Sequence, residues 1–331
     1  MLAPISRDRL ATLLAAARGQ RVVVVGDAML DVYLRGDVER ISPEAPVPVV
    51  RVRDRRDALG GAANVAQNVL AVDAQCSLVA AVGDDIAGNR LRGLLRGMGG
   101  ATDALVTVAR PTTTKTRLLA RSQQLLRFDE EEDADLAEAD VARVIAALTA
   151  ALASADAVIL EDYNKGVLVP AVIEATIRLA TERRIPVIVD PKFRNFFSYK
   201  GATVFKPNRR ELEQALGAAV DLTHAEALPA TLARLDVQHL LLTLSEHGMA
   251  LVSRDGEITR IPTTAREVYD VVGAGDTVTA YLALMLAGGA TAREAAVIAN
   301  YAAGVEVGKL GAATVSVAEV LAAYDALHLT T

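Results

Sequence analysis

The chain has 331 residues, of which 52% are hydrophobic and 23% are charged, a composition typical of a soluble globular enzyme with a large core. The formal net charge of −6 excludes a general basic surface for nucleic acid or for an anionic membrane. Cys76 is the only cysteine, so an internal disulfide and a thiolate metal site are excluded, in agreement with a reducing cytoplasm.

Short β-branched strands alternate with amphipathic helices along most of the chain. The predicted strands are 21–25, 157–160, 185–189, 203–205 and 239–242, and the predicted helices are 62–72, 86–97, 136–153, 170–183, 209–216, 226–235 and 291–308. This alternation indicates an α/β fold with a mostly parallel central sheet and helices on both faces. We expect residues 1–331 to form a single domain. Polar residues follow each predicted strand, and ligands bind at the carboxyl ends of such strands, so the pattern favours an enzyme.

Two regions, 33–58 and 103–129, interrupt this alternation with strand-like patterns. We interpret them as strands of a small accessory sheet, a β lid over the site; the alternative is a surface excursion. If 113–121 is one continuous strand, Lys115, Arg117 and Arg121 share a face, because side chains alternate along a strand. These cations suit a phosphate-bearing substrate, or else they cover a solvent-facing sheet.

The segment Gly273-Ala274-Gly275-Asp276 precedes an apolar run over 277–286 and predicts a glycine turn at the N-terminus of a buried helix. Glycine lets backbone N–H groups approach a ligand closely, and a helix N-terminus favours phosphate. A carboxylate beside such a site can orient a hydroxyl group and deprotonate it. The motif therefore indicates phosphoryl transfer to an alcohol; the alternative is a glycine turn with an N-terminal cap.

A second glycine segment, Gly60-Gly61 followed by Asn64, lets a ligand approach the backbone and offers a donor and an acceptor for sugar hydroxyls. Together the two segments resemble the signature regions of the ribokinase-like (PfkB) carbohydrate kinases. That resemblance implies that Asp276 is the catalytic base and that the backbone of 273–275 stabilises the transferred phosphoryl group.

The resemblance also implies a sugar-binding role for Asp31, which follows the first strand, with Asp27 assisting. Asp270 stands where family members often place an aspartate near a monovalent cation. Val272 replaces the threonine often found there, so a K⁺ requirement stays open.

On the nucleotide side, Asn208 and Glu211 match the Asn-x-x-Glu motif that organises Mg²⁺ and the ATP phosphates in the family. Glu211 is expected to reach Mg²⁺ through water, and the alternative is a helix cap with a capping-box glutamate. Ser245 stands where a glycine is common in the family, and Asn300 could equally be a satisfied helix asparagine. The resemblance implies nucleotide-binding positions at Thr243, Ser245, Gly248 and Asn300.

Within this family, segments 40–49, 123–129 and 162–168 resemble the heptose-7-phosphate kinases. These enzymes use ATP to phosphorylate C1 of D-glycero-β-D-manno-heptose 7-phosphate, in the ADP-heptose pathway to lipopolysaccharide. Some relatives carry a C-terminal nucleotidyltransferase domain, and we expect the stand-alone kinase because the chain ends at Thr331. The further residues expected on the substrate side are Gln124, Glu161 and Lys192.

The sequence is also compatible with other functions. The chain could act on another sugar or sugar phosphate, or serve as a non-catalytic sugar-phosphate sensor, although Asp276, Asn208 and Glu211 argue against the latter. A dinucleotide-binding oxidoreductase is disfavoured because Gly26-Asp27-Ala28 lacks the required glycine spacing. The sequence shows no apolar run of membrane-spanning length and no signal-peptide core. We expect a cytoplasmic homodimer joined through the open edges of the lid sheet.

Overall fold

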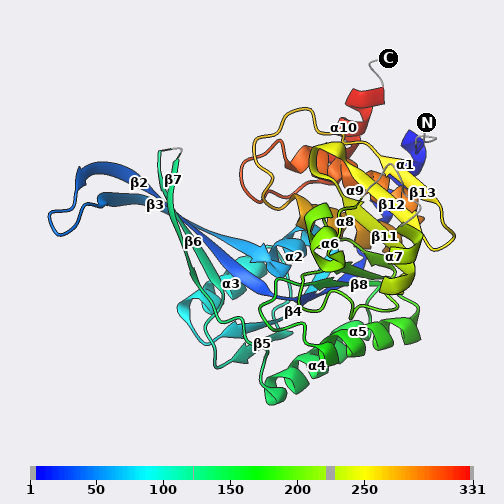
Figure 1. Cartoon of the computed structure of the whole chain (residues 1–331), viewed down its shortest axis with the longest axis horizontal. Coiled ribbons are helices and arrows are strands. Elements are labelled where there is room, and N and C mark those ends of the chain that lie inside the picture. Colours follow the sequence, from blue (N-terminus) through cyan, green and yellow to red (C-terminus); the bar gives the residue numbers. More distant parts are fainter. Residues whose placement is uncertain (1–4, 122, 221–227, 329–331) are drawn as a thin grey trace.

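The computed structural model describes residues 5–121, 123–220 and 228–328 and contains two sheets (Figure 1). The larger has nine strands in the order β13-β12-β11-β10-β9-β8-β1-β4-β5. Neighbouring strands from β5 to β11 are parallel, and β12 and β13 add antiparallel pairs at one edge. Their bounds are β1 Arg21–Gly26, β4 Gln75–Gly83, β5 Leu105–Val108, β8 Ala157–Glu161, β9 Val187–Asp190, β10 Val204–Phe205, β11 His239–Thr243, β12 Met249–Ser253 and β13 Ile258–Ile261.

Helices cover both faces of this sheet, because its buried strands are apolar on both sides. In β1, Val22 and Val24 enter one core and Val23 and Val25 enter the other. The first core lies under α1 (Arg7–Ala16), α2 (Ala62–Leu70), α3 (Ile86–Gly97), α8 (Ala274–Ala287), α9 (Ala292–Glu306) and α10 (Val317–His328). The second lies under α4 (Glu138–Leu152), α5 (Pro170–Arg183), α6 (Arg209–Leu216) and α7 (Leu228–Leu235).

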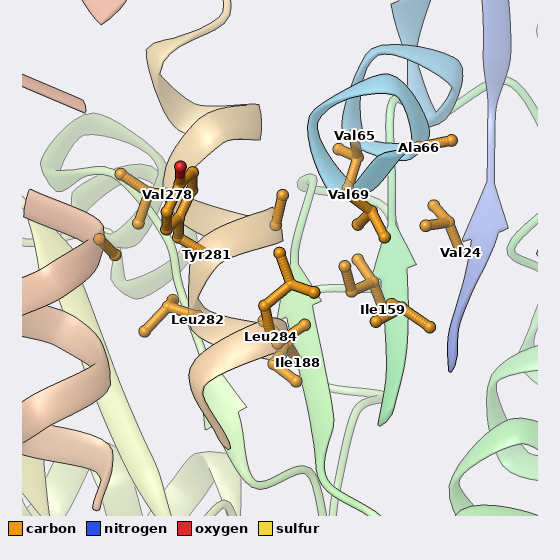
Figure 2. Packing of buried hydrophobic residues seen from close by; sticks show 14 of the residues in the cluster. Val24, Val65, Ala66, Val69, Ile159, Ile188, Val278, Tyr281, Leu282 and Leu284 are labelled. Atoms are coloured by element: carbon orange, nitrogen blue, oxygen red, sulfur yellow. The ribbon is translucent and has the colours of Figure 1, made fainter. Parts of the chain in front are cut away.

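Helix α8 is buried along almost its whole length, as expected for a helix that is apolar on all sides. Figure 2 shows Leu284 of α8 beside Ile188 of β9, and Val69 of α2 directed toward Ile159 of β8. The hydroxyl of Tyr281 donates to the carbonyl of Val315 at 2.8 Å. This packing fixes the N-terminus of α8 at the carboxyl ends of the central strands.

The smaller sheet has the order β3-β2-β6-β7 and projects from the body of the molecule (Figure 1). Its strands are β2 Ala28–Ile41, β3 Pro48–Gly61, β6 Thr114–Ala120 and β7 Gln123–Glu130. Strand β2 pairs antiparallel with β3 and parallel with β6. Asp27 alone separates β1 from β2, so this sheet begins at the carboxyl edge of the larger one.

The expected fold class is confirmed: the chain is α/β, with a mostly parallel sheet, helices on both faces and a second, small sheet. The accessory-sheet interpretation fails for Leu105–Val108, which forms β5 at the edge of the larger sheet. The predicted strand through position 121 is also wrong at its end. Strand β6 stops at Ala120, and Arg121 adopts a positive φ of 56° outside it.

Helix α7 begins at Leu228, and positions 226 and 227 of the predicted helix lie outside the described residues. Within the described ranges, no helix combines the length and the apolar character needed to cross a membrane.

Candidate active site

The turn before α8 places a carboxylate at a helix N-terminus. Gly273 precedes the helix with φ 98°, a conformation that favours glycine, and a Cβ there would lie 3.2 Å from Nδ2 of Asn64. The first N–H groups of a helix have no intrahelical acceptor, so the N–H of Gly275 can face an anion. The N–H of Ala274 lies 3.4 Å from the carbonyl oxygen of Val271. Asp276 follows within the first turn.

Asp276 is 6% exposed and accepts two side-chain hydrogen bonds. Nδ2 of Asn64 donates to Oδ2 at 2.5 Å, and the hydroxyl of Tyr163 donates to Oδ1 at 3.0 Å. Burial, with a smaller contribution from Asp190, raises the pKa of Asp276 to about 6, although these two hydrogen bonds act in the opposite direction. The carboxylate is therefore ionised near neutral pH yet basic enough to accept a proton.

Three carboxylates converge at this point. One oxygen each from Glu161, Asp190 and Asp276 lie within 4.8 Å of one another. Nζ of Lys206 contacts Oδ2 of Asp190 at 2.7 Å. Glu161, Asp190 and Lys206 come from or directly follow β8, β9 and β10, so the parallel sheet itself brings these charges together.

Asp27 holds the loop that carries Tyr163. Its carboxylate accepts backbone N–H groups of Tyr163, Lys165 and Val167 at 2.8 to 3.1 Å. Burial raises the pKa of Asp27, and these three hydrogen bonds oppose the rise. The structure thus gives Asp27 a positioning contact with this loop in addition to its predicted place beside the substrate.

Asp31 lies on β2, where Nη1 of Arg117 on β6 contacts its Oδ1 at 2.5 Å. A Cβ at Gly60 would lie 2.5 Å from Oδ2 of Asp31, so only glycine leaves that carboxylate its space. Gly61 has φ 55° and caps α2, the helix that carries Asn64. The second glycine segment therefore joins Asp31 of the small sheet to the Asn64–Asp276 contact.

Lys115 of the small sheet and Lys192, in the loop after β9, approach the same ring. Nζ of Lys115 on β6 lies 5.4 Å from the centre of the Tyr163 ring, and Nζ of Lys192 lies 5.6 Å from it. Burial lowers the pKa of Lys115. Lys192 also forms an ion pair with Glu211. Gln124, in contrast, lies on the exposed strand β7 opposite Leu119.

Asn208 and Glu211 form a reciprocal capping box at the start of α6. The amide N–H of Glu211 donates to Oδ1 of Asn208 at 2.8 Å, and the amide N–H of Asn208 donates to Oε2 of Glu211 at 2.9 Å. The capping alternative is thus present in the structure. Oε1 of Glu211 faces Lys192, which links the cap to the basic group beside Tyr163.

Of the remaining residues predicted to bind the nucleotide, Thr243, Ser245 and Gly248 lie between β11 and β12 or at their ends, and Asn300 lies on α9. Thr243 ends β11 and bridges to Asn208, and Gly248 has φ 81°, where a Cβ would lie 2.1 Å from the carbonyl oxygen of Ile261. Ser245 has φ 53°, which explains physically why a glycine suits that position. Nδ2 of Asn300 donates to the carbonyl of Pro262 at 2.8 Å, so this side chain is a satisfied helix asparagine here.

Asp270 ties two loops together. Its Oδ1 accepts the N–H of Val272 at 3.0 Å, and its Oδ2 accepts the N–H of Gly311 at 3.1 Å. These contacts order the turn ahead of Gly273. The predicted cation role of Asp270 stays a prediction.

Sequence reasoning did not assign three residues of the site: Tyr163, Asp190 and Lys206. Asp190 and Lys206 directly end or follow strands, which is the signal that could have found them. The contact of Tyr163 with Asp276 joins positions 113 residues apart, and no local sequence pattern predicts it.

A family model described as pfkB family carbohydrate kinase matches residues 20–319. The bifunctional protein HldE of Gluconacetobacter diazotrophicus is 50% identical over 309 residues, covering 92% of this chain. The HldE protein of Caulobacter vibrioides is 47% identical over 319 residues and 95% of this chain. The chain spans 64% and 65% of the length of these two relatives.

Solved structures show the same fold. Arabidopsis thaliana ribokinase, complexed with ribose and ATP, has a TM-score of 0.72 at 20% identity and covers 92% of this chain and 98% of its own. Escherichia coli phosphofructokinase-2, in complex with potassium, has a TM-score of 0.78 at 18% identity and covers 93% and 99%. The family model matches most of the chain, and the chain therefore belongs to the pfkB family of carbohydrate kinases.

Proposed function

We propose that this chain is an ATP-dependent kinase for the C1 hydroxyl of D-glycero-β-D-manno-heptose 7-phosphate, yielding the 1,7-bisphosphate for ADP-heptose and lipopolysaccharide synthesis. The observation that carries the kinase part is Asp276, a buried carboxylate of raised pKa at a helix N-terminus. The resemblance of segments 40–49, 123–129 and 162–168 to heptose-7-phosphate kinases supports the substrate, as does the identity to proteins named HldE.

In this proposal Asp276 orients the C1 hydroxyl and accepts its proton. Asn64 and Tyr163 hold the carboxylate by one oxygen each, so its orientation is set before the sugar arrives. The N–H groups of the 273–275 turn face the phosphoryl group as it gains charge. A loose phosphoryl-transfer state needs little early proton removal, so a base with a pKa of about 6 suffices.

The side chains near the turn suit Mg²⁺ and ATP. Mg²⁺ prefers oxygen ligands and retains waters, and Glu211 supplies a carboxylate beside Lys192. When bound, Mg²⁺ neutralises charge on the phosphates during transfer. The adenine side would lie along Thr243, Ser245, Gly248 and Asn300.

The sugar phosphate would lie under the small sheet, which we propose acts as a lid within a single kinase domain. Asp31 would accept sugar hydroxyls, held in place by Arg117. Lys115 and Lys192, both within 5.6 Å of the Tyr163 ring centre, supply positive charge for the 7-phosphate.

We further propose a cytoplasmic homodimer formed through the lid sheet. Strands β3 and β7 are its edges, and open edges pair readily with a second copy. The sheet also exposes large apolar side chains at Val38, Val52, Leu126 and Phe128.

An ADP-release assay over a panel of sugars and sugar phosphates tests this function. Heptose 7-phosphate should give the highest kcat/KM, and Asp276→Asn should abolish most of the signal. Preference for another sugar phosphate would reject the substrate but keep the kinase. An absence of ATP turnover with every panel member, together with retained sugar-phosphate binding, would indicate a sensor.

A further inference from the structure

Gln67 of α2 contacts Asn64, the side chain that donates to Asp276. Its Nε2 donates to Oδ1 of Asn64 at 2.6 Å and to the carbonyl oxygen of Ala312 at 3.4 Å. Gln67 is partly buried, and Asn64 is 2% exposed. A chain of hydrogen bonds therefore runs from a backbone carbonyl through two side-chain amides to Asp276.

The direction of this chain is set at both ends, because the group at each end can only accept. A backbone carbonyl carries no proton to donate, and neither does the carboxylate of Asp276 in its ionised form. The carbonyl of Ala312 therefore requires the NH₂ end of Gln67, and Asp276 requires the NH₂ end of Asn64. The two requirements agree, since the NH₂ group of Gln67 then meets the oxygen of Asn64.

Other contacts fix the position of Asn64 and leave the rotation of its amide to be set by Gln67. The backbone carbonyl of Asn64 accepts Nδ2 of Asn68 at 3.0 Å, and the hydroxyl of Thr277 on α8 donates to Oδ1 of Asn68 at 3.2 Å. The two ends of an amide have nearly the same shape, so hydrogen-bond partners decide which end faces which neighbour. A half-turn of the amide would place Oδ1 of Asn64 against Oδ2 of Asp276, and two acceptors repel each other.

We propose that Gln67 is a positioning residue for phosphoryl transfer, which holds the amide of Asn64 with its NH₂ group toward Asp276. Gln67 acts through Asn64 and supplies no group to the reaction itself. This inference rests on the proposed function, in which Asp276 accepts the proton of the sugar hydroxyl. Without the held donor, less of the carboxyl is ionised near neutral pH, and less of it can act as a base.

Infrared titration of the Asp276 carboxyl tests this role without sugar or ATP. Each chain is compared with its own Asp276→Asn counterpart, so that the difference spectrum reports this carboxyl. Gln67→Met removes the donor and keeps the length of the side chain. The midpoint should rise by roughly one pH unit, because a hydrogen bond to a charged group changes an equilibrium constant about tenfold or more. The acid limb of kcat/KM should move with it. The other titratable or charged groups around Asp276 stay in place in the Gln67 variants: Glu161, Tyr163, Asp190, Lys206 and Glu306.

Asn64→Ala separates positioning from a structural role, because it removes the group through which Gln67 acts. Gln67→Met should shift the midpoint in the parent chain and leave it unchanged when it is added to Asn64→Ala. Gln20→Met is the matched control. Gln20 is also partly buried, and its Nε2 donates to the carbonyl oxygen of Ala16 at 3.0 Å, beside the N-terminal end of β1 and away from the site. This control should titrate as the parent chain does.

Three results would overturn the role of Gln67. They are a parent-like midpoint for Gln67→Met, a shift that persists in the Asn64→Ala chain, and an equal shift in Gln20→Met. Gln67→Leu also lacks a donor and carries the same test if Gln67→Met does not fold. Failure of the proposed function is seen separately, because near-parent turnover of Asp276→Asn would remove Asp276 from catalysis and leave the effect of Gln67 on its carboxyl measurable.

Discussion

The hydroxyl of Tyr163 donates a hydrogen bond of 3.0 Å to Oδ1 of Asp276, across 113 positions of the chain. Asn64 occupies the other oxygen, Oδ2. Hydrogen bonds to the ionised form stabilise it, so both contacts hold the pKa of Asp276 below the value that its burial alone would produce. Tyr163 is therefore a positioning residue that tunes Asp276.

Replacing Tyr163 by phenylalanine should raise the pKa of Asp276 further, because one stabilising hydrogen bond to the carboxylate disappears. The acid limb of kcat/KM, expected near pH 6 in the parent chain, should move to higher pH. At pH 8.5 the activity should recover most of its parent value. A pH–rate profile measures both effects.

Tyr199→Phe is the matched control for this shift. The hydroxyl of Tyr199 donates to Oδ2 of Asp162 at 2.7 Å, so the same atom is removed from a buried tyrosine–aspartate pair that does not include Asp276. Its acid limb should coincide with that of the parent chain. Identical profiles for Tyr163→Phe and the parent would contradict the tuning role.

Asp276→Asn removes the base and keeps the size of the side chain. Turnover should fall by roughly 10²- to 10⁴-fold, the usual range for loss of a general base, while the melting temperature stays near that of the parent. Single-turnover phosphoryl transfer measures the step directly. A variant that retains near-parent turnover would remove Asp276 from this role.

Parts of this site can be predicted from the sequence because the residues that form them are close together in the chain. The glycine turn and apolar run predict Asp276 at the start of a buried helix, and the capping box between Asn208 and Glu211 follows from spacing alone. Parallel-sheet topology predicts that strand-end groups meet. That rule also covers Asp190 and Lys206, although it does not say which strand ends become neighbours.

Other parts depend on tertiary packing. Strand β5, Leu105–Val108, lies in the strand-like stretch 103–129 together with β6 and β7, and only its pairing with β4 places it in the larger sheet. The Asn64–Asp276 contact joins positions 212 residues apart. Side-chain partners of this kind are set by how α2 and α8 pack, which periodicity cannot determine.

Arg117→Met should weaken sugar binding. The guanidinium holds Asp31 at 2.5 Å, and a hydrogen bond to a charged group contributes about 1.5 to 3 kcal/mol, or roughly ten- to a hundredfold in an equilibrium constant. KM for the sugar phosphate should rise by about that factor while kcat changes little. Steady-state kinetics with the sugar phosphate varied at saturating ATP measures it.

Arg127→Met is the control on the same sheet. Arg127 pairs with Asp129 at 2.6 Å on the exposed strand β7, where ion pairs contribute little. Its KM should match that of the parent. Equal effects of the two substitutions would mean that charge on the sheet, rather than the Arg117–Asp31 contact, governs binding.

Glu306 is expected to make stability depend on pH. Burial raises its pKa to about 8, with the neighbouring Asp270 and Asp276 adding to the rise and the amide of Ala313 opposing it. In the unfolded chain this carboxyl ionises near its ordinary pKa of about 4.3. Folding stability is therefore fully present below that value and is lost progressively as pH rises toward 8.

Glu306→Gln should remove this loss, so that its melting temperature exceeds that of the parent at pH 8 and approaches it near pH 5. Glu294→Gln, on the same helix, is the control of opposite sign. The side-chain hydrogen bond with Arg9 is the largest of the causes that lower the pKa of Glu294 to about 2. The ionised Glu294 therefore stabilises the folded state above about pH 4.3, and this stabilisation is lost as the pH falls through about 2. Glu294→Gln should accordingly lower the melting temperature at pH 8. Thermal unfolding of all three chains between pH 5 and 8 measures both effects, and a Glu306→Gln curve parallel to that of the parent would show that Glu306 does not ionise in this range.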